Sequence, residues 1–317
     1  MSERSRTQDI LVDILGVQNT INTYLGLINA ELGGGGAVAT NNIDLAGRPV
    51  ERTIYVDSSA PAGGDGLTRE TAFQTVQEGL DLSDSTNGLD LVLIFDDPGG
   101  DGYDINRNDG DSTWASNVVM IGMGREQVRI INSFEGATHV LGFEGCSVYI
   151  SNIRLWTGDE SYVQYLLALD GCDASEIENC DFYLLNSGTG SFGINLEETS
   201  RAKINNSHFY FEWDKGVDNA ISNGIWVNGS MRNEVNRCIF DGAHPSVPGG
   251  YGIMVDTGSR QNVFRENSFI ENTIAIECDQ TTENNFSVRN NYGGCAADFV
   301  DDSGDNYEVC PCTTAVI

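Results

Sequence analysis

A repeated strand-like segment dominates the second half of the chain. Five copies share an apolar anchor, polar or small residues, and a further apolar residue: YISNIRLW (149–156), EIENCDFYLL (176–185), KINNSHFYF (203–211), EVNRCIFDG (234–242) and VFRENSFIE (263–271). The anchors are spaced by 27, 27, 31 and 29 residues: Ile150, Ile177, Ile204, Val235 and Phe264. Such a period predicts a solenoid, propeller or array. Glycine-punctuated strands without helical periodicity favour an all-β solenoid with about three short strands per turn.

Equivalent positions of stacked repeats should form ladders along the solenoid. Three residues after the anchors the ladder is expected to be interior: Cys180, Ser207, Cys238 and Asn267. Five residues after them, an aromatic core stack is expected: Phe182, Phe209, Phe240 and Phe269. Asn152, Asn179 and Asn206 recur two residues after the anchors, and Asn tolerates the left-handed backbone that a sharp bend requires.

The cluster of Glu178, Asn179, Cys180 and Asp181 could be taken for a metal or catalytic site, but the repeat favours another interpretation. We expect Glu178 and Asp181 to face solvent. Cys180 and Cys238 should lie two coils apart, about 10 Å, and should not form a disulfide.

These repeats resemble the right-handed parallel β-helix proteins of the pectate-lyase-like superfamily. The stretch YVDSSAPAGGDGLTRETAFQTVQEGLD (55–81) resembles the opening segment of many members, in which a helix, here expected at about 70–82, caps the first coil. NNYGG (290–294) resembles the ending of the copper-chaperone-like members. The resemblance covers about residues 53–300 and implies the architecture only, because the superfamily contains lyases, hydrolases and non-catalytic adhesins.

The chain divides into five segments. We expect a helical anchor at 1–32, a Gly-rich linker at 33–52, a β-helix opening and capping region at 53–145, regular coils at 146–300 and a C-terminal cap or tail at 301–317. The anchor has a coiled-coil seam: Ile10, Ile14, Val17, Ile21, Tyr24 and Ile28. The alternative is an amphipathic helix docked on its own domain. The flexible run GGGG (33–36) favours an oligomerisation segment instead.

The charge is strongly negative. A net charge of −30, with only two lysines, disfavours nucleic-acid binding and is typical of proteins adapted to high salt; a GC-rich genome is the alternative explanation. The N-terminus lacks the features of a signal peptide, and no apolar run approaches the roughly 18–20 residues of a membrane span. We expect no membrane insertion.

Metal and cofactor signals are weak. The loop 96–112 contains a candidate calcium cluster, Asp96, Asp97, Asp101 and Asp104, but the EF-hand register fails and a solvated acidic loop is favoured. Zinc-site spacing is absent, and we expect buried thiols and no cofactor. A bridge among Cys295, Cys310 and Cys312 stays open.

The combination of an N-terminal oligomerisation helix, a flexible glycine run and a β-helix body without a signal peptide resembles a virion appendage. We expect a structural virion surface protein of a haloarchaeal tailed virus, either a tail spike or fibre or a capsid turret, assembled in the host cytoplasm. It should be a homo-oligomer, a trimer first and a pentamer second, attached to other virion proteins through its N-terminus. Its β-helix would contact a host glycan or glycoprotein, or stabilise the particle.

Two alternatives remain: a polysaccharide lyase or glycoside hydrolase, and a cellular surface adhesin. No catalytic residue is identified. Arg201, Arg232, Arg260 and Arg289 recur near coil edges, where structural pairing is the favoured interpretation. About five complete coils fit between Cys146 and Gly294, few for a groove that binds a long glycan.

Overall fold

The structure is a computed structural model that describes residues 50–84, 89–95, 97, 99–105, 113–124, 127–133, 137–156, 163–185, 191–212, 222–242 and 249–309. The predicted anchor at 1–32, its seam residues and residues 33–49 of the linker lie outside this range, as do Cys310 and Cys312. From Glu51 onwards, the described residues belong to one unit, Glu51–Ile317.

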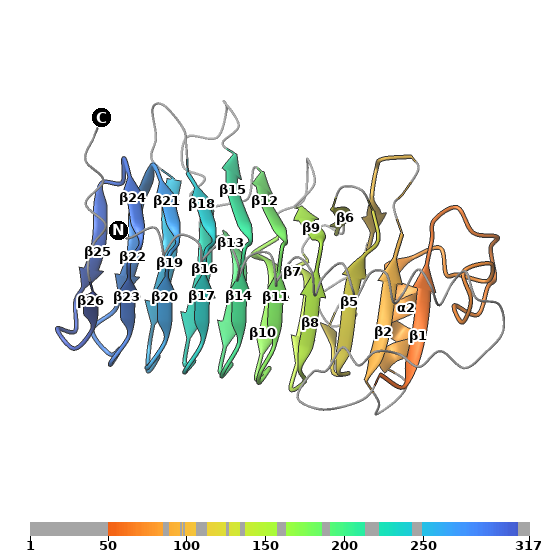
Figure 1. Cartoon of the computed structure of the whole chain (residues 1–317), viewed down its shortest axis with the longest axis horizontal. Helices are drawn as coiled ribbons and strands as arrows, with labels where there is room; N and C mark the ends of the chain where they lie inside the picture. Colours follow the sequence, from red (N-terminus) through yellow and green to blue (C-terminus); the bar gives the residue numbers. More distant parts are fainter. Residues whose placement is uncertain are drawn as a thin grey trace, which may run out of the picture. The chain divides into compact units, whose positions relative to one another are not determined.

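Within the described residues, the strands form three parallel sheets, and from β2 onwards the chain visits each sheet once per coil (Figure 1). The first sheet has ten strands: β1 (Arg52–Val56), β2 (Asp90–Ile94), β5 (Val118–Gly122), β8 (Val148–Ser151), β11 (Glu176–Glu178), β14 (Lys203–Asn205), β17 (Glu234–Asn236), β20 (Val263–Arg265), β23 (Phe286–Val288) and β26 (Tyr307–Val309).

The other two sheets have eight strands each in the described part. The second sheet contains β3 (Tyr103–Asp104), β6 (Val128–Ile131), β9 (Ile153–Trp156), β12 (Asp181–Leu185), β15 (His208–Glu212), β18 (Ile239–Asp241), β21 (Ser268–Ile270) and β24 (Asn291–Gly293). The third contains β4 (Thr113–Trp114), β7 (His139–Glu144), β10 (Tyr165–Asp170), β13 (Ser191–Glu197), β16 (Ser222–Asn228), β19 (Gly249–Asp256), β22 (Asn272–Cys278) and β25 (Ala297–Asp301). The predicted all-β parallel solenoid is confirmed.

The turn from the first to the second sheet is one residue between β8 and β9 and two residues from the turn between β11 and β12 onwards. Its first residue has a left-handed backbone, with φ of 57° at Asn152, 53° at Asn179 and 48° at Asn206. The same conformation continues at Arg237 and Glu266, with φ of 54° and 58°, although neither residue type favours it. The bend is therefore a property of the coil, and Asn is only its least costly occupant.

The second residue of this turn is buried and bonds to the next coil. The Cys180 amide donates to Ser207 Oγ at 3.2 Å, and the Cys238 amide donates to Asn267 Oδ1 at 2.9 Å. The four ladder residues are only 1–2 % exposed. Cys180 and Cys238 are separated by the Ser207 coil, and neither is in a disulfide.

The interior is filled by a stack of phenylalanine rings on the second sheet. Centroids of consecutive rings are 4.7, 4.7 and 4.8 Å apart along Phe182, Phe209, Phe240 and Phe269, with interplanar angles of 8–9°. Opposite Phe209, Gly193 leaves the space the ring needs, since a Cβ there would approach the ring to 2.7 Å.

The helix α2 (Val76–Asp84) covers the coil that contains β1 and β2. It begins at Val76 rather than near residue 70, because Thr75 and Glu78 form a capping box: the Glu78 amide donates to Thr75 Oγ1 at 3.2 Å, and the Thr75 amide donates to Glu78 Oε2 at 3.2 Å. Gly79 allows close packing, since a Cβ there would lie 2.8 Å from Val56 Cγ2. No helix in the described ranges combines the length and apolar character needed to cross a membrane.

Replacing Phe209 by Ala should destabilise the protein by about 3–5 kcal/mol, because it opens a cavity between two stacked rings. The change is measured as the difference in unfolding free energy from urea titration. Ile239→Ala, at a position 38 % exposed on the adjacent strand, is the matched control and should change stability by only about 0.5 kcal/mol. Equal losses in the two variants would contradict the proposed role of the stack.

Candidate functional site

The outer face of the second sheet carries the most varied chemistry in the described part of the chain. Along each strand, every second side chain points inwards, so the residues beside each core phenylalanine point outwards. In-register pairing arranges the outward residues in two rows. One row reads Arg129, Arg154, Asp181, His208 and Ile239; the other reads Ile131, Trp156, Tyr183, Tyr210 and Asp241.

The second row is an aromatic surface. The Tyr183 and Tyr210 rings stack with centroids 4.2 Å apart and an angle of 19°, and Trp156 is the register partner of Tyr183. Two guanidinium groups lie over this surface, Arg129 at 4.6 Å from the Trp156 ring and Arg154 at 4.9 Å from the Tyr183 ring. Cation–π contacts of this kind hold the side chains in place.

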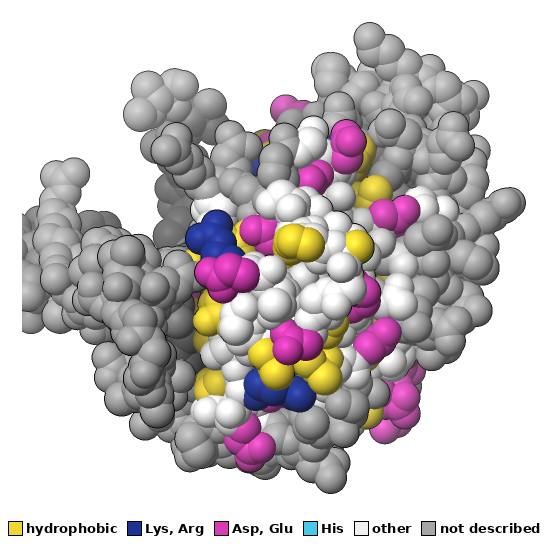
Figure 2. Space-filling model, turned by 90° about the vertical axis from the view of Figure 1, so that its right-hand side faces the viewer, with side chains coloured by type: hydrophobic (Ala, Val, Ile, Leu, Met, Phe, Trp, Pro, Cys, Tyr) yellow, Lys and Arg dark blue, Asp and Glu magenta, His cyan; other side chains and the backbone are white. Residues whose placement is uncertain are grey.

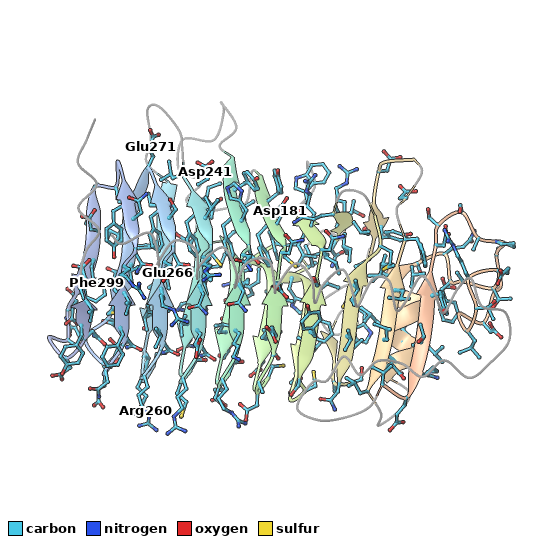
Figure 3. The ribbon with its side chains drawn as sticks, in the orientation of Figure 1. Asp181, Asp241, Arg260, Glu266, Glu271 and Phe299 are labelled. Carbon is cyan, nitrogen blue, oxygen red and sulfur yellow. The ribbon has the colours of Figure 1, made fainter. Side chains whose placement is uncertain are left out.

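His208 lies between two carboxylates. Asp181 is its register partner on β12, and Asp241 Oδ2 lies 4.0 Å from its Nε2. The imidazole also contacts the Tyr210 ring, with centroids 3.5 Å apart, and its Nε2 finds no hydrogen-bond partner among the described residues. Arg154 binds Asp181 at 3.2 Å. Figure 3 shows Asp181 and Asp241 on strands of this sheet.

Burial controls the protonation of this cluster. It lowers the pKa of His208 below its ordinary value of 6.5, and Asp181 and Asp241 oppose this effect only in part. Burial also raises the pKa of Tyr210, with Asp181 acting in the same direction. At neutral pH the face therefore presents a neutral imidazole and a protonated phenol.

This arrangement suits a sugar better than other ligands. A sugar ring offers an apolar C–H surface to an aromatic ring and hydroxyl groups to polar side chains at its rim, and Tyr combines both contacts. Carboxylates and imidazole can bind hydroxyls, whereas a nucleic-acid phosphate would be repelled. An imidazole beside carboxylates is also the equipment of a general acid or base.

The first sheet carries a separate polar groove of about 370 Å³. Its lining includes Asn236, Arg237 and Glu266, and the two charged groups are paired at 3.2 Å. Figure 3 shows Glu266 lower than Asp241, towards the first sheet. None of the groove's lining residues is aromatic, which leaves the second sheet as the stronger candidate.

An acidic row runs along the third sheet. Glu144, Asp170 and Glu197 are in register, and Asn228 and Asp256 continue the row. Glu277 lies on the adjacent row of the same sheet. Its pKa is raised by burial and then by repulsion from Asp302, Asp279 and Asp256. At the end of the β-helix that carries α2, acidic side chains are likewise scattered over the described surface, and basic side chains lie between them in small clusters (Figure 2).

Among the described aspartates of the calcium candidate, Asp97 and Asp104 bind neighbouring protein groups. The Asp97 carboxylate accepts hydrogen bonds from Ser58 Oγ at 2.8 Å and the Gly102 amide at 3.0 Å, and thereby closes its own turn. Asp104 accepts from Ser133, Asp101 is exposed, and Asp96 lies outside the described residues. In the described ranges no three potential ligand side chains gather around a point that could hold a metal.

The recurring arginines lie in structural turns. Arg201 and Arg232 have left-handed backbones, and their side chains bind Asp173 at 3.4 Å and Gln261 at 3.0 Å. Arg289 binds Glu266 at 3.3 Å. The residues that sequence reasoning overlooked are His208 and the aromatic row. The signal was present in DFY (181–183) and HFY (208–210), where polar and aromatic residues flank each core phenylalanine.

Lowering the pH should weaken the fold through His208. The unfolded chain binds a proton near pH 6.5 while the folded His208 does not, so stability falls as pH drops from 6.5 through the lower folded pKa. We expect His208→Asn to lose less stability than the wild type between pH 7.5 and pH 5, measured as urea midpoints. Leu67→Ala, at a position 48 % exposed between β1 and α2, is the control and should follow the wild type. Parallel pH curves for wild type and His208→Asn would contradict the assignment.

Comparison with known proteins supports the architecture. The model of the family described as "Right handed beta helix region" matches residues 127–310, more than half of the chain. No curated protein sequence matches. Among solved structures, pectin methylesterase PemA from Erwinia chrysanthemi is similar at 9 % identity and a TM-score of 0.45, covering 82 % of this chain and 93 % of that one.

Two further solved structures are similar at the same distant level. The pectin methylesterase from Aspergillus niger has 14 % identity and a TM-score of 0.41, and the match covers 84 % of this chain and 92 % of that one. Pectate lyase Pel9A has 11 % identity and a TM-score of 0.38, and the match covers 85 % of this chain and 83 % of that one. No residue role is transferred from such distant likenesses. The family model alone is decisive: the chain belongs to the right-handed β-helix family.

Proposed function

We propose that the chain is a structural surface protein that contacts glycan through the outer face of its second sheet. The observation that carries this proposal is the aromatic row of Trp156, Tyr183 and Tyr210 beside His208 and Asp241. Because the faces of Tyr183 and Tyr210 are turned towards each other, the row offers a sugar the edges and hydroxyl groups of its rings, repeated from coil to coil.

In this proposal the protein is part of the virion of a virus that infects a halophile. There it is a tail spike, a tail fibre or a capsid turret. Support comes from the heptad seam between Ile10 and Ile28, the glycine run that follows it, and the net charge of −30. The N-terminal segment attaches a homo-oligomer to other virion proteins, and the β-helix contacts the host surface.

A second candidate function is cleavage of the bound glycan. It is favoured by His208, whose neutral imidazole lies beside the carboxylates of Asp181 and Asp241 and could accept a proton at neutral pH. The two functions share one face, and product formation distinguishes them. The cellular adhesin alternative uses the same face and differs only in where the protein resides.

Removing the two stacked tyrosines should weaken glycan binding. Tyr183→Ala/Tyr210→Ala should bind at least about tenfold more weakly than the wild type to the oligosaccharides that the wild type retains on a glycan array in 2–4 M salt, because it loses two hydroxyl groups and the contact area of both ring edges. Tyr307→Ala is the matched control, since Tyr307 is a 50 % exposed aromatic on the first sheet. Equal binding by both variants would refute the assignment of this face.

Incubating the same oligosaccharides with the protein separates binding from cleavage. Under the leading proposal they are recovered intact. Shortened products that disappear in His208→Asn, while binding persists, would establish the second candidate function instead.

The N-terminal seam should control assembly. Light scattering of the full-length protein in 2–4 M salt should give the mass of a trimer or, as second choice, a pentamer. Ile14→Asp/Ile21→Asp should give a monomer, because charges at the seam cannot be buried. A wild-type monomer at high protein concentration would rule out this part of the proposal.

A further inference from the structure

We propose that Cys146 and Cys172 form an intrachain disulfide between neighbouring coils when they meet a low-molecular-weight disulfide oxidant. Their Sγ atoms lie 3.9 Å apart in the structure, where both side chains are buried thiols. Neither residue takes part in the outer face described above, so this inference stands independently of the proposed function.

The backbone places the two cysteines at equivalent positions of neighbouring coils. Glu144 and Asp170 are register partners, and the glycines that follow them, Gly145 and Gly171, have the same left-handed φ of 63° and 60°. Each cysteine comes one residue later. In-register strands are about 4.8 Å apart, which lies within the Cα separation that disulfides span. The sulfurs, 3.9 Å apart as thiols, must approach by about 1.9 Å to bond.

Hydroxyl residues hold the equivalent position in the next coils. The Cys172 amide donates to Thr199 Oγ1 at 3.3 Å, the Thr199 amide to Ser230 Oγ at 2.9 Å, and the Ser230 amide to Ser259 Oγ at 3.2 Å. A hydroxyl is thus sufficient for the structural ladder. Among the described residues, no other two cysteines occupy equivalent positions of neighbouring coils.

The reaction is a two-step exchange that balances. Cys146, at 5 % the more exposed of the two, loses its proton and attacks one sulfur of the oxidant, which releases one thiolate and leaves a mixed disulfide. The deprotonated Cys172 then attacks the Cys146 sulfur and releases the second thiolate. The pair loses two protons and two electrons, and the oxidant becomes two thiols. A hydrogen bond with Cys146 lowers the pKa of Cys172, which assists the second step.

The state of the cysteine pair would differ between protein inside a reducing cytoplasm and protein outside the cell. Reducing conditions keep the pair as thiols, whereas an oxidising exterior closes a loop of 26 residues. Such a loop restricts the unfolded chain and stabilises the fold.

The test uses the full-length protein, reduced and then incubated in its native state with oxidised glutathione. Peptide mapping without reduction should find Cys146 linked to Cys172, with a mass lower by two hydrogens. The thermal midpoint should rise by on the order of 5 °C and return on reduction.

Cys146→Ser and Cys172→Ser are the matched controls, because serine already occupies the ladder at Ser230 and Ser259. Each single variant should keep the midpoint of the reduced wild type and show no rise with glutathione. Two outcomes would overturn the proposal. One is a mixed disulfide that persists at Cys146. The other is a native protein whose two cysteines stay unlinked although the urea-unfolded chain forms disulfides under the same oxidant.

Discussion

The structure depends on satisfying the backbone of a tight buried turn from the neighbouring coil. At the two-residue bend between the first and second sheets, the buried amide of one coil donates to a side chain of the next, as Cys180 does to Ser207 and Cys238 to Asn267. An unpaired buried amide would cost about 1–3 kcal/mol. Each coil is therefore complete only when the next is in register, and the register determines every other contact.

In-register stacking acts on the surface as well as on the core. Residues of one type that recur along the sequence become direct neighbours, which favours rings such as Tyr183 and Tyr210 and penalises like charges such as Glu144 and Asp170. At Glu277, whose register partners Met254 and Val300 are uncharged, burial comes first and repulsion by three nearby aspartates second in raising the pKa. Salt screens such repulsion, so a stacked acidic row is least costly where salt is high.

Sequence periodicity was sufficient to predict the coil, the interior phenylalanines and the asparagine bends, because each depends on the residue itself. It did not predict left-handed backbone at Arg237 and Glu266, since the neighbouring coils impose that conformation. The stacking of β2 and β5 on the later coils was also hidden, because their sequences, LDLVLIF (89–95) and NVVMIGMG (117–124), lack the Asn-small-polar bend. The candidate face was missed because it needs register, which turns separated residues such as Asp181 and His208 into neighbours.

The phenylalanine stack has a consequence for how such a chain can change in length. Because each ring meets the next in nearly the same geometry, at 4.7, 4.7 and 4.8 Å, a coil offers its successor the same surface that it received from its predecessor. A gene duplication that copies one whole coil would insert a new rung without creating any unfamiliar interface. The protein can thus grow or shrink in whole coils, whereas the loss of a few residues within a strand would disturb the register of everything beyond it.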